Sequence, residues 1–491
     1  MSSLTDGPSN TPHRIPRHIR SWIERGERLL KRRGVESTLL HVLAFAICFS
    51  IYTSNVSGFK SATQAVSADI LNLMFANFYP SKRRDDIVVV VATDADIDHF
   101  GDQFPISYSL HETVLSRLES LQPKALLVDF VFAREQLQSE RSDANRFAEF
   151  LKGYSIPLFL ATGESTVERP NGVHPKFEAG TLVAVPRFLS LSKRGLYCFF
   201  HRDSVTNGAP ASETPGCTDD GTGPRVRPTA ALAIYDAVCG AGQPSSLCPP
   251  DRELRPFRDN YLRIIWGGDA SELFDFIPER SPCVRTPWWE MMRPDEETVA
   301  ADCPYHPQIT VLELLTAAND RALRDRLVEA MRGKIVVYGG FVGPSPDVIR
   351  PPTVRGIPGG HMHAMALDNL LTYGNGYKSD VTEIGGLPIK GSLVNVVFML
   401  LSYLLAVARD ARVTATKGRF DPLTSILTVS TIGFYTLFCW FSFAIFDLAP
   451  SNWVGAALTT VVLPALLRDG FLRVRSTMTG LYHRFRGEKA A

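Results

Sequence analysis

The sequence has almost no net charge, with 52 lysines and arginines against 51 aspartates and glutamates in 491 residues. A chain that binds nucleic acid is normally strongly basic, overall or along one face, so this balance argues against that class. The composition, 45% apolar and 21% charged, matches that of an ordinary globular chain. Composition therefore excludes a nucleic-acid partner and leaves the fold open.

Several short motifs that carry chemistry are also missing. The sequence has no GxGxxG or GxxxxGK[ST] loop for a dinucleotide or a phosphate, and no GxSxG nucleophile elbow. It has no CxxC pair and no Cys/His spacing typical of a zinc site, and no cysteine stands in the context of a nucleophile. We therefore expect no catalytic residue, no cofactor and no metal, and a protein that is not an enzyme.

Hydrophobic segments long enough to cross a membrane appear only when the sequence is read by position. About 20 apolar residues are needed to span the hydrocarbon core of a bilayer. The last of the segments is short, and its extension places Arg468 at the interface, where an arginine can reach the headgroups. The sequence predicts four transmembrane helices, at residues 37–59, 389–408, 424–446 and 453–472.

Basic residues flank these segments in a pattern that gives their direction. They cluster in residues 1–36, in the link 409–419 and in the tail 473–491. Loops rich in lysine and arginine stay in the cytoplasm, and four spans place every cluster there. The sequence thus predicts a multi-pass protein of a bacterial inner (plasma) membrane with both termini cytoplasmic. A cleaved signal peptide is the alternative for the first segment, although no clear A-x-A site follows it.

Residues 1–36 also place apolar side chains on one helical face among arginines. This pattern favours an amphipathic helix that lies on membrane lipid, and a solvated charged helix stays open as the alternative.

Residues 60–385 are predicted to form one folded domain in the periplasm or outside the cell. Continuous apolar runs at 87–93 and 125–132 are typical of strands buried on both faces. Strands and helices then alternate, which indicates an α/β fold with a largely parallel sheet and helices on both faces. We expect further strands at 157–161 and 334–338, and helices at 61–80, 109–121 (with a Ser109–Glu112 capping signal), 145–152, 310–330 (capped by Thr310 and Glu313) and 361–371.

Six of the eight cysteines fall in this outer domain, whereas Cys48 and Cys439 lie in predicted spans. An even number in an oxidising compartment indicates disulfides, and six cysteines allow 15 connectivities. We favour sequential pairing, with Cys239–Cys248 first, because each loop is short; free buried thiols are the alternative. The stretch that carries them, about 164–309, is predicted to be an insertion or a set of long loops. The disulfide candidates are Cys198, Cys217, Cys239, Cys248, Cys283 and Cys303.

Three motifs occur in a fixed order: VVVVATDADIDHFG, SYSLHETVLSRLESLQPKALLVDFVFA and GKIVVYGGFVGPSPDVIRPPTVRGIPGGHMHAMALDNLL. Together they resemble the second type of CHASE domain, the cyclase/histidine-kinase-associated sensing extracellular domain. The resemblance implies an extracytoplasmic α/β sensor domain that follows one transmembrane helix and precedes about three more. One departure is that Ser107 and Tyr108 stand where the family often has proline and arginine. The family usually continues into a cytoplasmic kinase, cyclase or phosphodiesterase, so the resemblance implies that a separate protein supplies the output here.

Carboxylates follow the first two predicted strands. Asp94 and Asp129 should lie at one edge of the sheet, where open α/β sheets bind their ligands, although capping of local turns is an equal alternative. For Asp96 and Asp98 we favour capping. The last predicted helix adds His363 and Asn369, two positions that match the resemblance. We favour His363 as a hydrogen-bonded packing residue. The ligand-binding candidates are Asp94, Asp129, His363 and Asn369.

These observations predict a non-catalytic sensory or accessory membrane protein that binds a ligand or a protein outside the cytoplasm and signals to a separate partner. The first alternative is a structural subunit of a larger membrane complex. The second is an extracytoplasmic hydrolase built on Asp94 and Asp129. The expected partners are membrane lipid and a separate signalling or complex-forming membrane protein, and homo-oligomerisation stays open.

The topology can be tested with reporter fusions. Fusions after Gly34, Lys417 and Glu488 should report a cytoplasmic position, because basic clusters are retained there, and a fusion within residues 140–300 should report an external one. Paired alkaline phosphatase and fluorescent-protein reporters give opposite signals and control for expression. A cytoplasmic signal from residues 140–300 would contradict the whole topology.

Overall fold

The computed structural model divides the chain into two compact units. One is Ser61–Val396 with Phe434–Val454, and the other is Met1–Lys60, Val397–Gly433 and Gly455–Ala491. The first unit holds nearly all of the described elements. The described residues are 58–133, 141–163, 171–185, 196–202, 216–217, 226–240, 245–250, 261–268, 304–342, 347–353, 356–379, 381–384 and 387–390, with scattered residues at 43–54 and 393–477.

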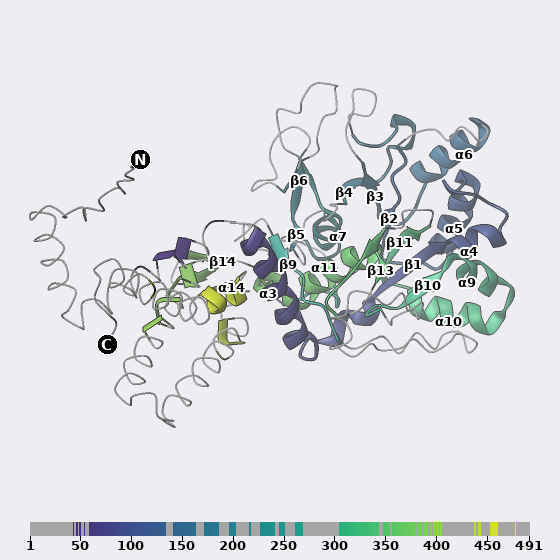
Figure 1. Ribbon diagram of the computed structural model, residues 1–491. Coiled ribbons are helices and arrows are strands. Elements are labelled where there is room, and N and C mark those ends of the chain that lie inside the picture. Colours follow the sequence, from purple (N-terminus) through teal and green to yellow (C-terminus); the bar gives the residue numbers. More distant parts are fainter. Residues whose placement is uncertain are drawn as a thin grey trace, which may run out of the picture. The chain divides into compact units, whose positions relative to one another are not determined.

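A six-stranded parallel sheet forms the centre of the larger unit (Figure 1). All of its strand pairs are parallel. The predicted α/β class with a parallel sheet is therefore confirmed for this unit. In spatial order the strands are β10 (Gln308–Thr310), β1 (Ile87–Thr93), β11 (Ile335–Phe341), β2 (Ala125–Asp129), β3 (Leu158–Thr162) and β4 (Thr181–Ala184).

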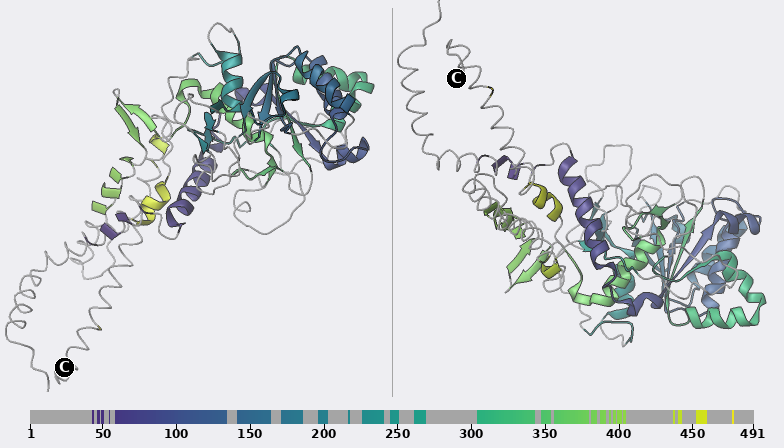
Figure 2. Two further views of the ribbon diagram at one scale, coloured as in Figure 1. Left: turned by 90° about the horizontal axis from the view of Figure 1, so that it is seen from above. Right: turned by 60° about the horizontal axis from the view of Figure 1, so that its bottom comes forward.

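Helices cover both faces of this sheet (Figures 1 and 2). We call the two sides the α11 face and the α5 face, after the most buried helix on each. The α11 face is packed by α3 (Phe59–Ala76), α7 (Ala230–Cys239) and α11 (Gly360–Tyr373). The α5 face is packed by α5 (Tyr108–Ser120), α6 (Arg141–Lys152), α9 (Val311–Thr316) and α10 (Arg321–Met331).

Strand β1 shows why the sequence folds in this way. Successive side chains of a strand point to opposite faces, so Val89 joins the core of the α11 face and Val90 that of the α5 face. Its first six residues are 2% exposed or less. Burial of one such aliphatic side chain stabilises the fold by about 1.5–3 kcal/mol. A run of β-branched residues without alternation therefore fits a central strand covered on both sides.

Of the two predicted helix-capping signals, one is confirmed and the other is wrong. Thr310 and Glu313 form a reciprocal capping box at α9. The predicted cap at Ser109 is wrong, because Ser107 is the N-cap of α5 and its hydroxyl accepts from the Leu110 N–H at 3.3 Å. Glu112 instead accepts from Arg146 Nε at 2.9 Å. The S-x-x-E spacing fits Ser109, but the N-cap is Ser107, whose N–H and hydroxyl donate to Asp102 Oδ2 at 3.0 and 2.7 Å.

The single helix expected at 310–330 is divided. Helix α9 ends at Thr316, a 3₁₀ turn η6 (Ala317–Asn319) follows, and Asp320 caps the separate helix α10 by accepting from two backbone N–H groups. The second capping residue explains the break, because a side chain that satisfies helix N-terminal donors favours a new helix start.

The stretch 164–309 is more than loops, which corrects its description as an insertion. It supplies β4 and β10, the two edge strands of the main sheet, and α7, which packs on the α11 face. Two small antiparallel sheets also lie here. One pairs β5 (Leu196–Cys198) with β9 (Tyr261–Arg263), and the other joins β7 (Gly216–Cys217), β6 (Phe200–Arg202) and β8 (Val226–Pro228).

No helix in the described part of the chain is both long enough and apolar enough to cross a bilayer. The four predicted spans lie largely outside the described residues, as does the basic segment 1–36. The remaining described elements are η2 (Ser81–Asp86), α4 (Asp94–His99), η3 (Pro175–Phe177), the pairs β12 (Val348–Ile349) with β13 (Ile357–Pro358) and β14 (Val381–Ile384) with β15 (Leu387–Lys390), η7 (Gly374–Gly376) and α14 (Trp453–Ala457).

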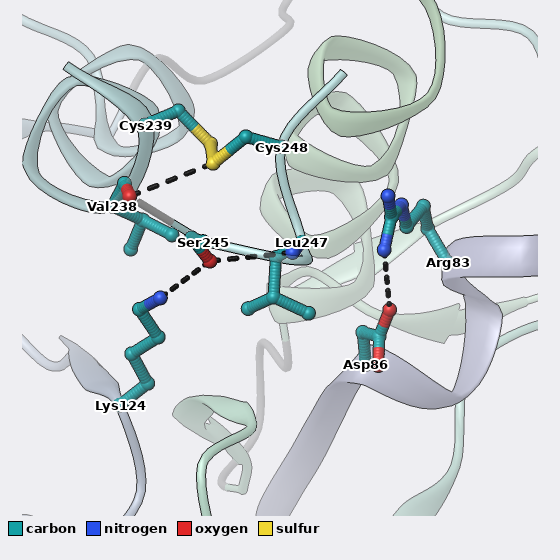
Figure 3. Close-up of a disulfide and its surroundings, with 8 residues drawn as sticks. All are labelled: Arg83, Asp86, Lys124, Val238, Cys239, Ser245, Leu247 and Cys248. Carbon is teal, nitrogen blue, oxygen red and sulfur yellow. Dashed lines mark hydrogen bonds and ion pairs between the residues drawn. A yellow bond between two sulfur atoms is a disulfide. The ribbon is translucent and has the colours of Figure 1, made fainter. Parts of the chain in front are cut away.

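Cys239 and Cys248 form a disulfide with Cα atoms 5.5 Å apart, as predicted (Figure 3). The bond closes the turn after α7. Within that turn Ser245 Oγ accepts from Lys124 Nζ at 2.5 Å and from the Leu247 N–H at 3.2 Å. Cys198 is also disulfide-bonded. Sequential pairing of the other cysteines stays a prediction, and Cys283 and Cys303 lie outside the described residues.

Removal of the Cys239–Cys248 bond should lower the free energy of unfolding by about 2–3 kcal/mol, because the bond restrains a short loop of the unfolded chain. Urea unfolding of the Cys239→Ala/Cys248→Ala double variant measures the loss. The single variant Cys239→Ala is the matched control and should lose similar stability while gaining one alkylatable thiol. Alkylation of both cysteines in wild-type native membranes would contradict the bond.

Candidate functional site

The order of the strands creates a topological switch point at the carboxyl edge of the sheet. Strand β11 lies between β1 and β2 and is followed by α11, which packs on the α11 face. The chain after β1 and after β2 instead leads to α5 and α6 on the opposite face. Neighbouring strands whose following helices diverge to opposite faces form the switch point where open α/β sheets bind ligands. The carboxyl ends of β1, β11 and β2 are therefore the first place to look for a site.

Asp94 and Asp129 both lie at this edge but do not form a pair. Asp94 directly follows β1 as the first residue of α4, and Asp129 ends β2 beside Gly339 of β11. Because β11 separates the two strands, their backbones are about 10 Å apart. Asp94 is exposed, whereas the side chain of Asp129 is only 10% exposed. Of the two, Asp129 is the one built into the fold.

Asp129 belongs to a chain of three polar side chains from three distant segments. Its Oδ2 lies 3.7 Å from Nε2 of His363 on α11. Nδ1 of His363 is 2.8 Å from the hydroxyl of Tyr197 on β5, and that hydroxyl accepts from the Ala231 N–H at 3.2 Å. His363 and Tyr197 are buried. The structure thus joins two of the four candidates, Asp129 and His363, and adds Tyr197.

The contacts of His363 fit a neutral imidazole that carries its proton on Nε2. The Tyr197 hydroxyl accepts from Ala231, so its own proton can be donated to His363 Nδ1. When Tyr197 donates in this way, the proton of the neutral imidazole lies on Nε2, on the side of the Asp129 carboxylate. Burial lowers the pKa of His363 to about 4, and the nearby carboxylate of Asp347 opposes part of that shift. The imidazole is therefore neutral at pH 7.

The amino terminus of α11 completes the site. Gly360 opens the helix, and a Cβ there would lie 3.2 Å from Val337 Cγ1 of β11, so the helix start lies close against the sheet. Gly359, the preceding residue, donates its N–H to the Asp347 carbonyl at 2.8 Å. The close approach brings the positive end of the α11 dipole to the strand end that carries Asp129.

Asp96 is a structural residue, as its favoured interpretation predicts. Its Oδ2 accepts from the N–H and the hydroxyl of Thr93 at 2.7 and 2.8 Å, which forms a capping box at α4. Its Oδ1 accepts from the Leu312 N–H of α9 at 3.1 Å. One buried carboxylate therefore serves the amino termini of two helices.

Asn369 is fully buried, and its amide is bound to backbone. Oδ1 accepts from the Ile265 N–H at 3.0 Å, while Nδ2 donates to the carbonyls of Ile265 and Met365 at 3.0 and 2.9 Å. It lies farther along α11 than His363, away from the Asp129 chain. Its candidacy as a ligand residue stays a prediction, and its observed contacts are those of a packing residue.

Sequence reasoning missed a buried network beside Asn369. Asp368 accepts from the Tyr79 hydroxyl at 2.5 Å and lies 3.2 Å from His306 Nε2. His361 reaches Gln308 through Nε2 at 2.8 Å. The two histidine rings are 6.5 Å apart. The one available signal was the density of polar residues on a helix whose spacing otherwise predicts burial.

The described residues contain no group of three or more His, Cys, Asp or Glu side chains arranged for a metal ion. What the site offers is a hydrogen-bond acceptor with negative charge at Asp129, a neutral imidazole, and the amino end of α11. This arrangement can bind a ligand that presents hydrogen-bond donors or a positive group.

Comparison with known proteins gave one match. The profile of the CHASE2 domain family matches residues 43–405. No curated protein and no solved structure matches the chain.

Protonation of the buried histidines should make stability depend on pH. Burial lowers the pKa of His363 to about 4 and the pKa values of His111 and His361 to about 3. Between pH 6.5 and 4 the unfolded chain binds protons at these positions and the folded chain does not, so stability falls as the pH falls. Each histidine contributes a slope of about 1.4 kcal/mol per pH unit in that window.

The His363→Gln variant should therefore lose about 1.4 kcal/mol per pH unit of that slope between pH 6 and 4.5. Urea titrations at a series of pH values measure it. Phe104→Gln, at a side chain that is 58% exposed, is the non-titrating control and should keep the wild-type slope. An unchanged slope in His363→Gln would contradict a buried neutral imidazole.

Proposed function

This chain belongs to the CHASE2 domain family, a family of sensory domains, and from that premise we propose that it is a non-catalytic sensory membrane protein. In this proposal the α/β domain binds a small ligand or a protein outside the cytoplasm. The membrane segments pass the bound state to a separate signalling partner.

The observation that carries the proposal is the Asp129–His363–Tyr197 chain at the switch point of the sheet. Three side chains from β2, α11 and β5 meet at the strand ends where open α/β sheets bind their ligands. Asp129 supplies a charged acceptor, and a ligand with an amine, a guanidine or another hydrogen-bond donor matches it chemically. A ligand bound there contacts α11, the most buried helix of the α11 face.

Two sets of contacts support a membrane-anchored arrangement. Met399 and Ala456 are buried together with Phe49 packed against them, which brings residues of three predicted spans into one cluster. In the larger unit the Trp453 indole N–H donates to the Ser67 carbonyl at 3.2 Å, and the Val454 N–H donates to Ser67 Oγ at 3.0 Å. Both residues lie at the predicted outer end of the last span, so their contact with α3 fits an external position for α3.

The partner proposed for the signal is a separate membrane protein. The predicted cytoplasmic segments 1–36, 409–419 and 473–491 are short and basic. Such segments suit contact with anionic lipid or with an acidic surface of a partner. The structural-subunit alternative shares these segments and differs in one respect, which is that it requires no ligand.

The proposal predicts ligand-dependent stabilisation of the full chain in mild detergent. Melting curves with amino acids, polyamines and divalent cations should show a shift with one class, worth about 2.7 kcal/mol at 100 times the dissociation constant. Asp129→Asn should remove that shift, because the charged acceptor is lost, and Asp98→Asn, at an exposed residue of α4, should keep it. Absence of any shift, together with co-purification in fixed stoichiometry with a complex, would favour the structural-subunit alternative instead.

A further inference from the structure

A short segment, which we call the strap (Ile264–Gly268), joins α3 to α11 through buried hydrogen bonds. On one side Asn369 of α11 holds the N–H and the carbonyl of Ile265, both at 3.0 Å. On the other side Asn72 of α3 accepts from the Trp266 N–H at 3.0 Å, and the Ala76 carbonyl accepts from the Gly268 N–H at 2.9 Å. Asn72 and Asn369 are 1% exposed or less.

Each asparagine is also tied to its own helix. Asn72 Nδ2 donates to the Ala68 carbonyl at 3.0 Å, and Asn369 Nδ2 donates to the Met365 carbonyl at 2.9 Å. The two side-chain amides therefore have fixed orientations. If the strap moved with one helix, its hydrogen bonds to the other helix would be strained. A buried amide that lost its backbone partner would be costly, which keeps the three segments together.

The strap fits so closely that two of its residues have to be glycine. A Cβ on Gly268 would lie 2.8 Å from Asn77 Oδ1 and 3.2 Å from backbone atoms of Ala76. A Cβ on Gly267 would overlap the ring of Tyr305 at 1.9 Å. The strap therefore lies directly against the end of α3.

A second connection runs between the same two helices. Tyr79, three residues after α3, donates its hydroxyl proton to Asp368 Oδ1 at 2.5 Å. His306 Nε2 and the Thr372 hydroxyl approach the same carboxylate at 3.2 and 3.0 Å. Asp368 and His306 are fully buried, and Tyr79 is 7% exposed. A charge that is buried at this depth requires all of its partners, so the network resists separation of Tyr79 from α11.

The two ends of helix α11 thus make different sets of contacts. Its first turns carry His363, which contacts Asp129 and Tyr197, and its second half carries Asp368 and Asn369. His363 and Asp368 are five residues apart, which is about 7.5 Å along the axis of a continuous helix. A displacement at the amino end is carried to the other end because the helix moves as one body.

We propose that α11 and the strap form a mechanical link that couples the state of the Asp129–His363 site to α3, the helix that follows the first predicted span. The biological role of this link rests on the proposed function, because ligand binding would be the event that moves α11. Its physical basis is two independent sets of buried polar contacts that bind α3 to one helix. Release of both sets lets α3 move without α11, and release of one set weakens the link.

Hydrogen–deuterium exchange of the full chain in detergent micelles tests the link without any ligand. His363→Ala perturbs the site end of α11, and exchange of the amides in α3 should speed up by at least about fivefold, the lower end of usual coupling between sites. In the background of Asn72→Ala with Tyr79→Phe, the same His363→Ala change should leave α3 exchange as it was in that background. This double-mutant comparison isolates the coupling from the separate cost of each change.

The matched control is His111→Ala. His111 is also a buried histidine bound to a tyrosine hydroxyl, that of Tyr338 at 3.1 Å, but it lies on the α5 face. It should leave α3 exchange unchanged. Equal acceleration of α3 in His363→Ala and His111→Ala would indicate general loosening and overturn the link, as would no acceleration in His363→Ala.

This outcome is separate from that of the melting experiment. A ligand shift without coupling would refute the link and keep the sensor, whereas coupling without any ligand shift would keep the link and refute the sensor. If the background variant fails to fold, Tyr79→Phe alone, which removes the hydroxyl that donates to Asp368, replaces it. It should weaken the response of α3 to His363→Ala.

Discussion

The burial of α11 is the constraint on which much of the α11 face depends. Twelve of its residues are buried, among them four with polar side chains, His361, His363, Asp368 and Asn369. A buried polar group without a partner costs about 1–3 kcal/mol, so each of the four requires a partner from elsewhere in the fold. The partners come from different segments: Gln308, Tyr197 with Asp129, Tyr79 with His306, and the backbone of Ile265. One helix thereby positions the edge strand, the site, the end of α3 and the strap.

The two faces of the sheet differ in how they are held together. The core of the α5 face is mainly apolar and aromatic, and its buried polar contacts include His111 with Tyr338 and Asp96 with the amino terminus of α9. The α11 face carries the polar network described above together with an apolar core. Apolar contacts are non-directional and tolerate small shifts, whereas buried hydrogen bonds fix relative orientation. The face that specifies orientation is the one that touches both the site and α3.

Local features of this fold could be predicted from the sequence, and features that depend on strand order could not. The strand at 87–93 and the Thr310–Glu313 cap were predictable because a β-branched run and a capping box depend on neighbouring residues. The separation of Asp94 from Asp129 was not predictable, because β11, more than 200 residues later in the chain, enters between their strands. Tyr197 was missed for the same reason, since it is 166 residues from His363. Strand β4 has only 4 residues, and α7 is apolar almost all round, so hydrophobic periodicity gives little signal in either.

The central place of β11 also sets the order in which the domain can be assembled. Strands β1 and β2 emerge from synthesis long before β11, and each then presents an open, apolar edge. Any pairing of β1 with β2 in its absence would be non-native, because β11 lies between them in the folded sheet. A sheet closed by such distant contacts folds slowly and exposes aggregation-prone edges meanwhile. In the topology proposed above, the native sheet can form only after the chain has been exported past Phe341, and until then the edges of β1 and β2 lack their native partner.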